Sequence, residues 1–342
     1  MCRLTFLSFL LVLSFFSLKS QNKSKSALIA FYNLENFYDT INDPKTKDDE
    51  FTPEAENHWN TEKYNIKLEH ISKVIKEIGD ENGFKCPTVM GMCEIENKQV
   101  IQDLINSQNL KIFNYGFEHY DCRYERGVDV ALIYRKDRFI VVNSKAYPLI
   151  IPDKPDFNTR DQLLVSGILD GEVVHFIVNH WPSRRGGEKR SAPMREAAAK
   201  LCRHIVDSIY KTDSTAKIII MGDLNDDPTN ASIIKHIGAQ KTKESTKNYG
   251  LYNPMYELFK KKGIGSLAYN DKWNLFDQFI VSYPLISKSI GGYKFIKAGV
   301  FNKPYLMQKE GQFAGYPFRT YVGTTFMGGY SDHFPSFIII SK

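Results

Sequence analysis

The segment 217-KIIIMGDLND-226 decides the fold, because an apolar run of strand length ends there in two carboxylates and an amide. Residues 217–221 predict a buried strand, and the polar residues after it predict a turn. Six further segments repeat this arrangement of an apolar strand beside a polar cluster. They cover residues 27–32, 88–93, 128–134, 173–178, 275–282 and 334–340.

Helical segments lie between these strands. Apolar residues recur with a helical period over residues 61–78, where Asn60 is a suitable N-cap and Gly79 a suitable end. Residues 98–105 and 193–210 predict two further helices. Alternating strands and helices predict an α/β fold in which helices cover the sheet faces. Functional side chains in such folds gather on the loops at the strand ends.

The composition excludes several classes of protein. The chain has 342 residues, of which 42% are hydrophobic and 25% charged, so it is neither collagen-like nor disordered. The formal charge of +6 permits an anionic partner without requiring one. Neither a Gly-rich nucleotide loop ending in Lys-Ser/Thr nor a Gly-x-Ser-x-Gly elbow occurs, which argues against P-loop hydrolysis and acyl transfer.

Residues 1–20 predict a secretory signal peptide. Arg3 precedes an apolar run from Leu4 to Leu18, and Ser20 offers a small residue for cleavage. The run of about 15 residues is shorter than the ~20 needed to span a bilayer, so we favour a signal peptide over a retained membrane anchor. We therefore expect a mature domain of residues 21–342 that is secreted or periplasmic and has no stable membrane association.

Four cysteines follow the predicted signal peptide, at positions 86, 93, 122 and 202. An even number in an exported chain allows disulfides. Cys86 and Cys93 flank a predicted strand, and seven extended residues span ~23 Å, which argues against a direct bridge between these two.

Acidic residues stand at or beside the strand ends, with amides in equivalent positions. The acids are Glu35, Glu94, Asp223, Asp277 and Asp332, and the amides are Asn33, Asn179 and Asn225. A single acid after a strand is usually a solvated turn or a helix cap. Five acids brought together would be costly without a cation or shared protons. Oxygen ligands without thiolates suit Mg²⁺ or Mn²⁺, and Ca²⁺ is also compatible.

Two histidines occupy similar positions. His180 ends a strand in 179-NHWPS-183, and His333 lies in 331-SDHFP-335. A histidine beside a carboxylate can transfer a proton or stabilise charge at phosphorus. The other six histidines, including His119, lie in contexts that predict packed or solvated imidazoles.

Basic residues near these clusters favour a phosphate substrate. The loop 184-RRGGEKR-190 carries Arg184 and Arg185 beside two glycines, which suits contact with a phosphate backbone. A solvated loop that keeps the protein soluble has the same composition. Arg126, just before Gly127 and a predicted strand, could bind a phosphate oxygen through its planar fork.

The order of these motifs resembles that of the endonuclease/exonuclease/phosphatase superfamily. The motifs are 33-NLE-35, Glu94, 126-RGVDVA-131, 179-NHWPS-183, 222-GDLND-226, 277-DQ-278 and 331-SDHFP-335. The resemblance spans the mature chain. It implies a four-layer α/β sandwich, with two stacked mixed β-sheets flanked by helices, and metal-dependent hydrolysis of a phosphate ester.

The resemblance also implies which residues hold the metal and the phosphate. Glu94 becomes the principal metal ligand, helped by Glu35, and Asp332 completes the metal or water network. Asn33 orients the phosphate near the metal. Tyr120 falls where some members of the superfamily contact the phosphate.

For the chemical step, the resemblance implies that Asp223 and Asn225 position the attacking water. His333 contacts the scissile phosphate and is oriented by Asp277, while His180 is a general acid or an electrostatic stabiliser. The general base stays open between Asp223 and the Asp277–His333 pair.

The segments 179-NHWPSRRGG-187 and 273-WNLFDQ-278 resemble secreted bacterial nucleases of this superfamily, although Cys122 and Tyr124 depart from the commoner pattern. We expect an exported monomeric nuclease that cleaves DNA, with RNA as a further substrate, without sequence preference. One alternative is a phospholipid or small phosphate-ester hydrolase, for which the aromatic segment 313-FAGYPF-318 is the candidate membrane contact. A binding module without catalysis is disfavoured, because none of the mechanistic positions is substituted.

Overall fold

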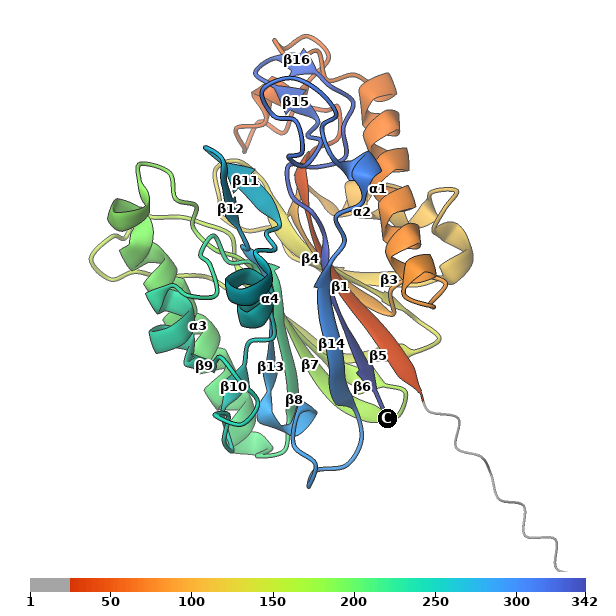
Figure 1. Ribbon diagram of the computed structural model, residues 1–342. Helices are drawn as coiled ribbons and strands as arrows, with labels where there is room; N and C mark the ends of the chain where they lie inside the picture. The colour runs from red at the N-terminus through yellow and green to blue at the C-terminus, as the bar shows by residue number, and fades with distance from the viewer. Residues whose placement is uncertain (1–24) are drawn as a thin grey trace, which may run out of the picture.

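Two mixed β-sheets lie face to face at the centre of the computed structural model, which describes residues 25–342 (Figure 1). The first sheet has the order β14 (Lys294–Val300), β17 (Ser336–Ser341), β1 (Ser26–Phe37), β2 (Val89–Ile95), β4 (Asp129–Arg135) and β3 (Tyr115–His119). The second has the order β5 (Phe139–Tyr147), β6 (Gln162–Leu169), β7 (Glu172–His180), β8 (Lys217–Asp223), β13 (Asp277–Ser282), β10 (Leu251–Tyr252) and β9 (Ala239–Gln240). The predicted signal peptide, residues 1–20, lies outside the described residues.

Helices cover the outer face of each sheet, which confirms the predicted four-layer α/β sandwich (Figure 1). The helices α1 (Thr61–Glu81) and α2 (Lys98–Asn106) pack on the first sheet, and α3 (Glu188–Thr212) packs on the second. The remaining elements are α4 (Met255–Lys262), the hairpins β11 (Leu267–Tyr269)–β12 (Lys272–Asn274) and β15 (Tyr321–Val322)–β16 (Thr325–Phe326), and short helical turns at Asp49–Phe51, Lys111–Phe113, Ser232–Ile237, Tyr283–Leu285 and Pro304–Leu306.

The central strands are apolar along their length because both of their faces are buried. In β1, Ile29 faces the second sheet and Ala30 faces the α1–α2 layer. In β8, Ile219 faces the first sheet and Ile220 faces the α3 layer. A strand covered on both sides loses the alternation of apolar and polar residues. This burial is the physical reason why the predicted strands appear in the sequence as continuous apolar runs.

The ends of the predicted helices differ from the structure in two places. Asn60 caps α1, its side chain accepting a hydrogen bond from the backbone N–H of Lys63. Gly79 does not end α1, which continues to Glu81. A side chain at Gly79 would place its Cβ 2.4 Å from the Cα of Cys86, so this glycine permits close packing of the following chain. The predicted helix at 193–210 begins earlier, at Glu188, with Pro193 inside it.

Several predicted strands also differ in extent. β2, β7 and β8 each end two residues later than predicted, at Ile95, His180 and Asp223. β1 continues to Phe37 and therefore contains Asn33 and Glu35 instead of ending before them. β13 and β17 begin two residues later than predicted, at Asp277 and Ser336. These shifts place the polar clusters on strand ends whose positions the sheets fix.

No disulfide joins the cysteines of residues 25–342, so the bridge between Cys86 and Cys93 that we argued against is indeed absent. Within the same residues, no helix combines the length and the apolar character that crossing a bilayer requires.

The packing at Gly79 gives a stability prediction. Replacing a helical glycine by alanine usually stabilises a protein, by about 0.5–1 kcal/mol. We expect Gly79→Ala to lower the free energy of unfolding by about 1–3 kcal/mol, because the added methyl group overlaps the backbone of Cys86. Urea unfolding measures the change. Lys73→Ala on the exposed face of α1 is the control, and a Gly79→Ala protein as stable as the wild type would contradict the prediction.

Candidate active site

Two irregularities interrupt the first sheet beside its polar side chains. The β1–β2 register shifts between Asn33 and Phe37, and the β2–β4 register shifts next to Glu94. Glu35 and Glu94 have left-handed backbones, with φ of 50° and 60°. Such conformations cost of order 1–3 kcal/mol in a residue other than glycine, and they occur where a bulge re-aims side chains at a functional site. The backbone N–H of Asn36 donates to Glu94 Oε2 at 2.9 Å and links the two bulges.

The side chain of Asn33 joins the two sheets. Its Nδ2 donates to Glu94 Oε1 at 3.3 Å and to Asp223 Oδ2 at 3.1 Å. Asp223 ends β8 in the second sheet, where it is in register with His180 of β7 and Asp277 of β13. These hydrogen bonds therefore join residues that are up to 190 positions apart in the sequence.

His333 lies beside this cluster and is bound to Asp277. Its Nδ1 is 2.7 Å from Asp277 Oδ2, and its Nε2 is 4.0 Å from Asp223 Oδ2. Burial by itself would lower the pKa of His333, but the charge and hydrogen bond of Asp277 raise that pKa well above its ordinary value. The hydroxyl of Ser266 donates to the same carboxylate oxygen of Asp277. His333 therefore holds a proton at neutral pH.

His180 has the opposite charge state. Its Nε2 lies 3.6 Å from Asp223 Oδ2 and 3.9 Å from Glu94 Oε1. Burial, and next the positive charges of Arg160 and Arg126, lower the pKa of His180 well below its ordinary value. The imidazole is therefore neutral at pH 7, and Asp223 lies between one neutral and one positively charged histidine.

Two carboxylates of the site hold protons more tightly than free acids do. Burial, reinforced by the negative charge of Asp277, raises the pKa of Asp223 to about 7 although His333 opposes the shift. Burial and the negative charge of Asp332 raise the pKa of Glu35 to about 7, against the effect of Lys67. Negative charge at this point is therefore only partly compensated by the protein.

Lys67 is a residue of the site that we did not select from the sequence. It is 1% exposed, its Nζ lies 3.8 Å from Glu35 Oε2, and it donates to the hydroxyl of Thr320. The backbone N–H of Thr320 also donates to Glu35 Oε2, at 2.7 Å. The position of Lys67, three residues after Tyr64 and four before Ile71 on the apolar face of α1, was the signal available in the sequence.

Three further predicted residues, Asn225, Asp332 and Arg126, lie around the same cluster. The backbone N–H of Asn225 donates to Asp223 Oδ1 at 2.9 Å, and its side-chain amide donates to the Trp181 carbonyl at 3.0 Å. The carboxylate of Asp332 lies between two side chains, with Oδ2 3.6 Å from Arg319 Nη2 and Oδ1 3.9 Å from His333 Nε2. The guanidinium of Arg126 donates to the side-chain oxygen of Asn36, which is next to the Glu94 bulge.

The donor atoms fit a hard divalent cation. Cys93 also lies close to His180 and Asp223. With one donor atom taken from each of these three residues, the donor atoms lie within 4.8 Å of one another. Burial raises the pKa of the Cys93 thiol well above its ordinary value, and hard cations prefer oxygen ligands to sulfur. The donors that remain for a hard cation are carboxylate oxygens of Glu94 and Asp223, and the neutral imidazole of His180 lies beside them. Mg²⁺ and Mn²⁺ favour such oxygen-rich sites.

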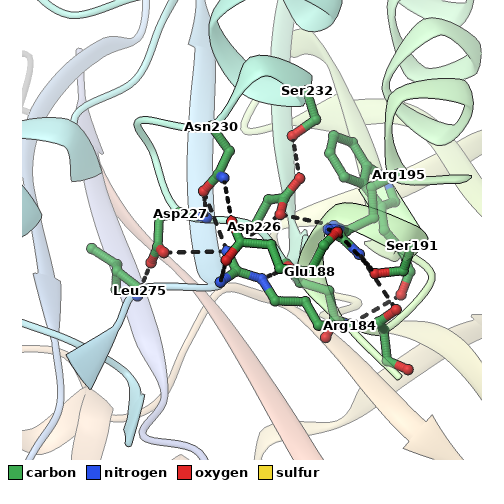
Figure 2. Close-up of polar contacts among 12 residues, drawn as sticks. Arg184, Glu188, Ser191, Arg195, Asp226, Asp227, Asn230, Ser232 and Leu275 are labelled. Atoms are coloured by element: carbon green, nitrogen blue, oxygen red, sulfur yellow. Dashed lines mark hydrogen bonds and ion pairs between the residues drawn. The ribbon is translucent and has the colours of Figure 1, made fainter. Parts of the chain in front are cut away.

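Arg184 does not have the position expected of a phosphate ligand. Figure 2 shows its guanidinium held among acidic and amide groups of the loop after β8. It donates to the Asn225 carbonyl at 3.0 Å and lies 3.3 Å from both Asp226 Oδ1 and Asp227 Oδ2. The fully buried Arg195 also binds Asp226, at 2.7 Å. Arg184 and Arg195 therefore hold the loop that carries Asn225.

Arg185 and Tyr120 are the last two residues that we predicted to contact the phosphate. Arg185 is exposed and lines a groove of about 670 Å³ between its own loop and the β11–β12 hairpin. Lys272 and Tyr269 of that hairpin line the opposite wall. The hydroxyl of Tyr120 contacts Ser144 of β5, at 2.7 Å, and not the cluster around Asp223, so its position does not support the expected phosphate contact.

The whole described chain is similar to a known family. Residues 28–342 match the family described as the Endonuclease/Exonuclease/phosphatase family. No curated protein matches the sequence. Among solved structures, a protein of that family from Bacteroides thetaiotaomicron is 17% identical with a TM-score of 0.58, over 93% of this chain and 98% of that one.

Two other similar structures have more specific names. Mannosyl-6-phosphatase from Bacteroides thetaiotaomicron is 16% identical with a TM-score of 0.56, over 92% of this chain and 99% of that one. TDP2 from D. rerio in complex with single-strand DNA product is 13% identical with a TM-score of 0.55, over 93% and 99%. At these identities the likeness shows the fold.

The pair formed by His333 and Asp277 can be tested by Asp277→Asn. Without the carboxylate, burial dominates and the pKa of His333 falls, so the imidazole loses its proton near neutral pH. We expect phosphodiester hydrolysis to fall by about 10²–10⁴-fold. Steady-state kinetics with a chromogenic phosphodiester and an NMR titration of the histidines measure both effects. Asp137→Asn, which changes an exposed acid paired with Arg135, is the control. Equal losses of activity in the two variants would contradict the role given to the His333–Asp277 pair.

The raised carboxyl pKa values predict that cation binding depends on pH. Below about pH 7, Asp223 is protonated, and a cation that binds its carboxylate must displace that proton. We expect the affinity for Mg²⁺ or Mn²⁺ to fall between pH 8 and pH 6, by about tenfold per pH unit for each proton released. Calorimetry in buffers of different ionisation enthalpy counts the protons. An affinity that is constant over this range would contradict the prediction.

Proposed function

Because the chain belongs to the endonuclease/exonuclease/phosphatase family of phosphoester hydrolases, we propose that it is a divalent-metal-dependent phosphodiesterase whose substrate is nucleic acid. DNA is the proposed main substrate, with RNA as a second one. One observation carries the proposal: Asp223 lies between a neutral and a protonated histidine, beside a groove with exposed basic and aromatic side chains.

The residues of the site divide the proposed reaction between them. Glu94, with Asp223 and Asn33 nearby, would hold the cation, which supplies positive charge to the phosphate oxygens and the leaving oxygen. His333 already carries a proton and therefore stabilises negative charge on the phosphate instead of accepting a proton from water. Asp223, with a pKa of about 7, is then the better general base, and the backbone contact of Asn225 fixes one of its oxygens.

The proposed nucleic-acid substrate rests on the groove beside the site. Its walls carry the exposed cations Arg185 and Lys272 and the aromatic ring of Tyr269, which is 71% exposed. Trp273 of the same hairpin stacks on Phe334, the residue after His333, with ring centroids 5.9 Å apart. Cations track a phosphate backbone, and exposed aromatic rings stack on unpaired bases. The DNA product bound to TDP2, a protein with the same fold, agrees with this proposal.

A small phosphate ester is the second candidate substrate. The groove volume of about 670 Å³ is within the range of small-molecule sites, and the similar mannosyl-6-phosphatase takes a substrate of that size class by its name. The phospholipid alternative has less support, because Tyr316 of the aromatic segment 313–318 binds Asp271 instead of projecting freely.

Export to the periplasm or the medium is also part of the proposal and rests on residues 1–20 alone. An N-terminus at Gln21 in the purified mature protein would support it.

A substrate panel tests the proposed function. The mature protein is incubated with supercoiled plasmid DNA, RNA, sphingomyelin vesicles and a hexose 6-phosphate, each with Mg²⁺, Mn²⁺ or EDTA. We expect nicking of the plasmid that requires the cation, and loss of that activity in Glu94→Gln, because a cation ligand is removed while the size is kept. The Asp137→Asn protein is the active control.

The variant Arg185→Ala/Lys272→Ala separates the candidate substrates. We expect it to raise KM for nucleic acid by about tenfold and to weaken the dependence on salt, with kcat nearly unchanged, since each phosphate contact adds to the salt dependence. Hydrolysis of the sugar phosphate together with an intact plasmid under every cation would favour the second candidate and overturn the nuclease proposal.

A further inference from the structure

The ends of β3 and β4 hold a second group of metal-binding side chains, formed by His119, Asp121 and Asp129. With one donor atom taken from each residue, the three donor atoms lie within 4.8 Å of one another. None of these residues takes part in the contacts of Asp223, Glu94 or the two active-site histidines described above. The group is therefore separate from the candidate active site.

His119 is the unusual member of this group. Its side chain is fully buried, yet neither ring nitrogen makes a hydrogen bond to any described residue. A buried polar atom without a partner costs about 1–3 kcal/mol, so such atoms in native proteins usually have an unseen partner such as a water or an ion. Both nitrogens face carboxylates: Nε2 lies 3.3 Å from Asp129 Oδ2, and Nδ1 lies 3.7 Å from Asp121 Oδ1.

These distances match a coordination site. Two ligands on one tetrahedral zinc ion, each about 2.0–2.1 Å from the metal, are separated by about 3.3–3.4 Å. The separation of 3.3 Å between His119 Nε2 and Asp129 Oδ2 agrees with that value. The carboxylate of Asp121 is 78% exposed and can rotate toward the same point, which also gives an ion a path of entry.

The surrounding charge also favours a cation. The buried Asp129 lines a small recess together with Asp161. The backbone N–H of Cys122 donates to Asp129 Oδ1, at 3.0 Å, and not to the Oδ2 that faces His119. Two carboxylates that share one recess are stabilised by a positive ion.

We propose that His119, Asp121 and Asp129 bind a divalent cation of the zinc class, and that this ion closes the base of the loop formed by residues 120–128. Imidazole with carboxylate ligands suits zinc and similar ions better than Mg²⁺ or Ca²⁺. The loop carries Arg126, whose guanidinium reaches the Asn36 side chain beside the active site. The ion thus acts as a structural support for that arginine and takes no part in the reaction.

Zinc titration of matched variants of the full mature protein tests this site. Because Zn²⁺ can also enter the candidate active site, calorimetry and metal analysis after dialysis compare wild type, His119→Ala and Asp223→Asn. We expect His119→Ala to lose one bound zinc per chain, or to bind it at least tenfold more weakly, while its affinity for Mg²⁺ stays unchanged. Asp223→Asn should retain the zinc that His119→Ala loses. His204→Ala, an exposed histidine on α3, is the control.

A second variant and a second measurement cover the case in which His119→Ala fails to fold. Asp121→Asn changes only an exposed side chain and should weaken the same zinc site. Trypsin should cleave after the exposed Arg123 several-fold more slowly with Zn²⁺ present, in the wild type but not in Asp121→Asn. Equal zinc binding by wild type, His119→Ala and Asp121→Asn would overturn the proposal.

Discussion

The hydrogen bonds from Asn33 to Glu94 and Asp223 join the two sheets at the place where buried negative charge is most concentrated. An amide can link two carboxylates, but it cannot neutralise them. The rest of the site depends on this constraint. Lys67 compensates Glu35, and His333 compensates Asp277, while Asp223 has only the longer contact of 4.0 Å to the same histidine. The charge left over explains why the raised carboxyl pKa values and the oxygen-rich donor set occur at the same point.

The two histidines of the site show that neighbouring charges can either reverse or reinforce the effect of burial on the pKa of an imidazole. Both imidazoles are buried, and burial lowers the pKa of each. The carboxylate of Asp277 reverses the effect for His333, whereas Arg160 and Arg126 reinforce it for His180. Placing one proton donor and one neutral imidazole on either side of Asp223 separates acid and base roles within a few ångströms. In the proposed reaction, this separation favours Asp223 over the Asp277–His333 pair as the general base.

The basic loop after His180 divides into structural and exposed cations. Arg184 and the buried Arg195 bind Asp226 (Figure 2). Arg184 also places its guanidinium over the ring of Phe276. Arg185, the next residue, is exposed and lines the groove without such partners among the ion pairs of residues 25–342. Net charge along the sequence cannot distinguish these cases, because a guanidinium that holds a loop and one that meets a phosphate have the same composition. The difference lies in which acids the fold brings within reach.

The sequence by itself determined the layered α/β fold and most of the site residues, because strands buried on both faces appear as apolar runs, and polar clusters follow them. It did not determine the bulges at Glu35 and Glu94, the end of α1, or the buried Lys67. Those features depend on contacts between residues far apart in the chain, such as Lys67 with Thr320 and Gly79 with the turn at Cys86. Tertiary structure alone also decided the charge of each histidine, since a pKa follows from burial and neighbouring charges, and neither is encoded in local sequence.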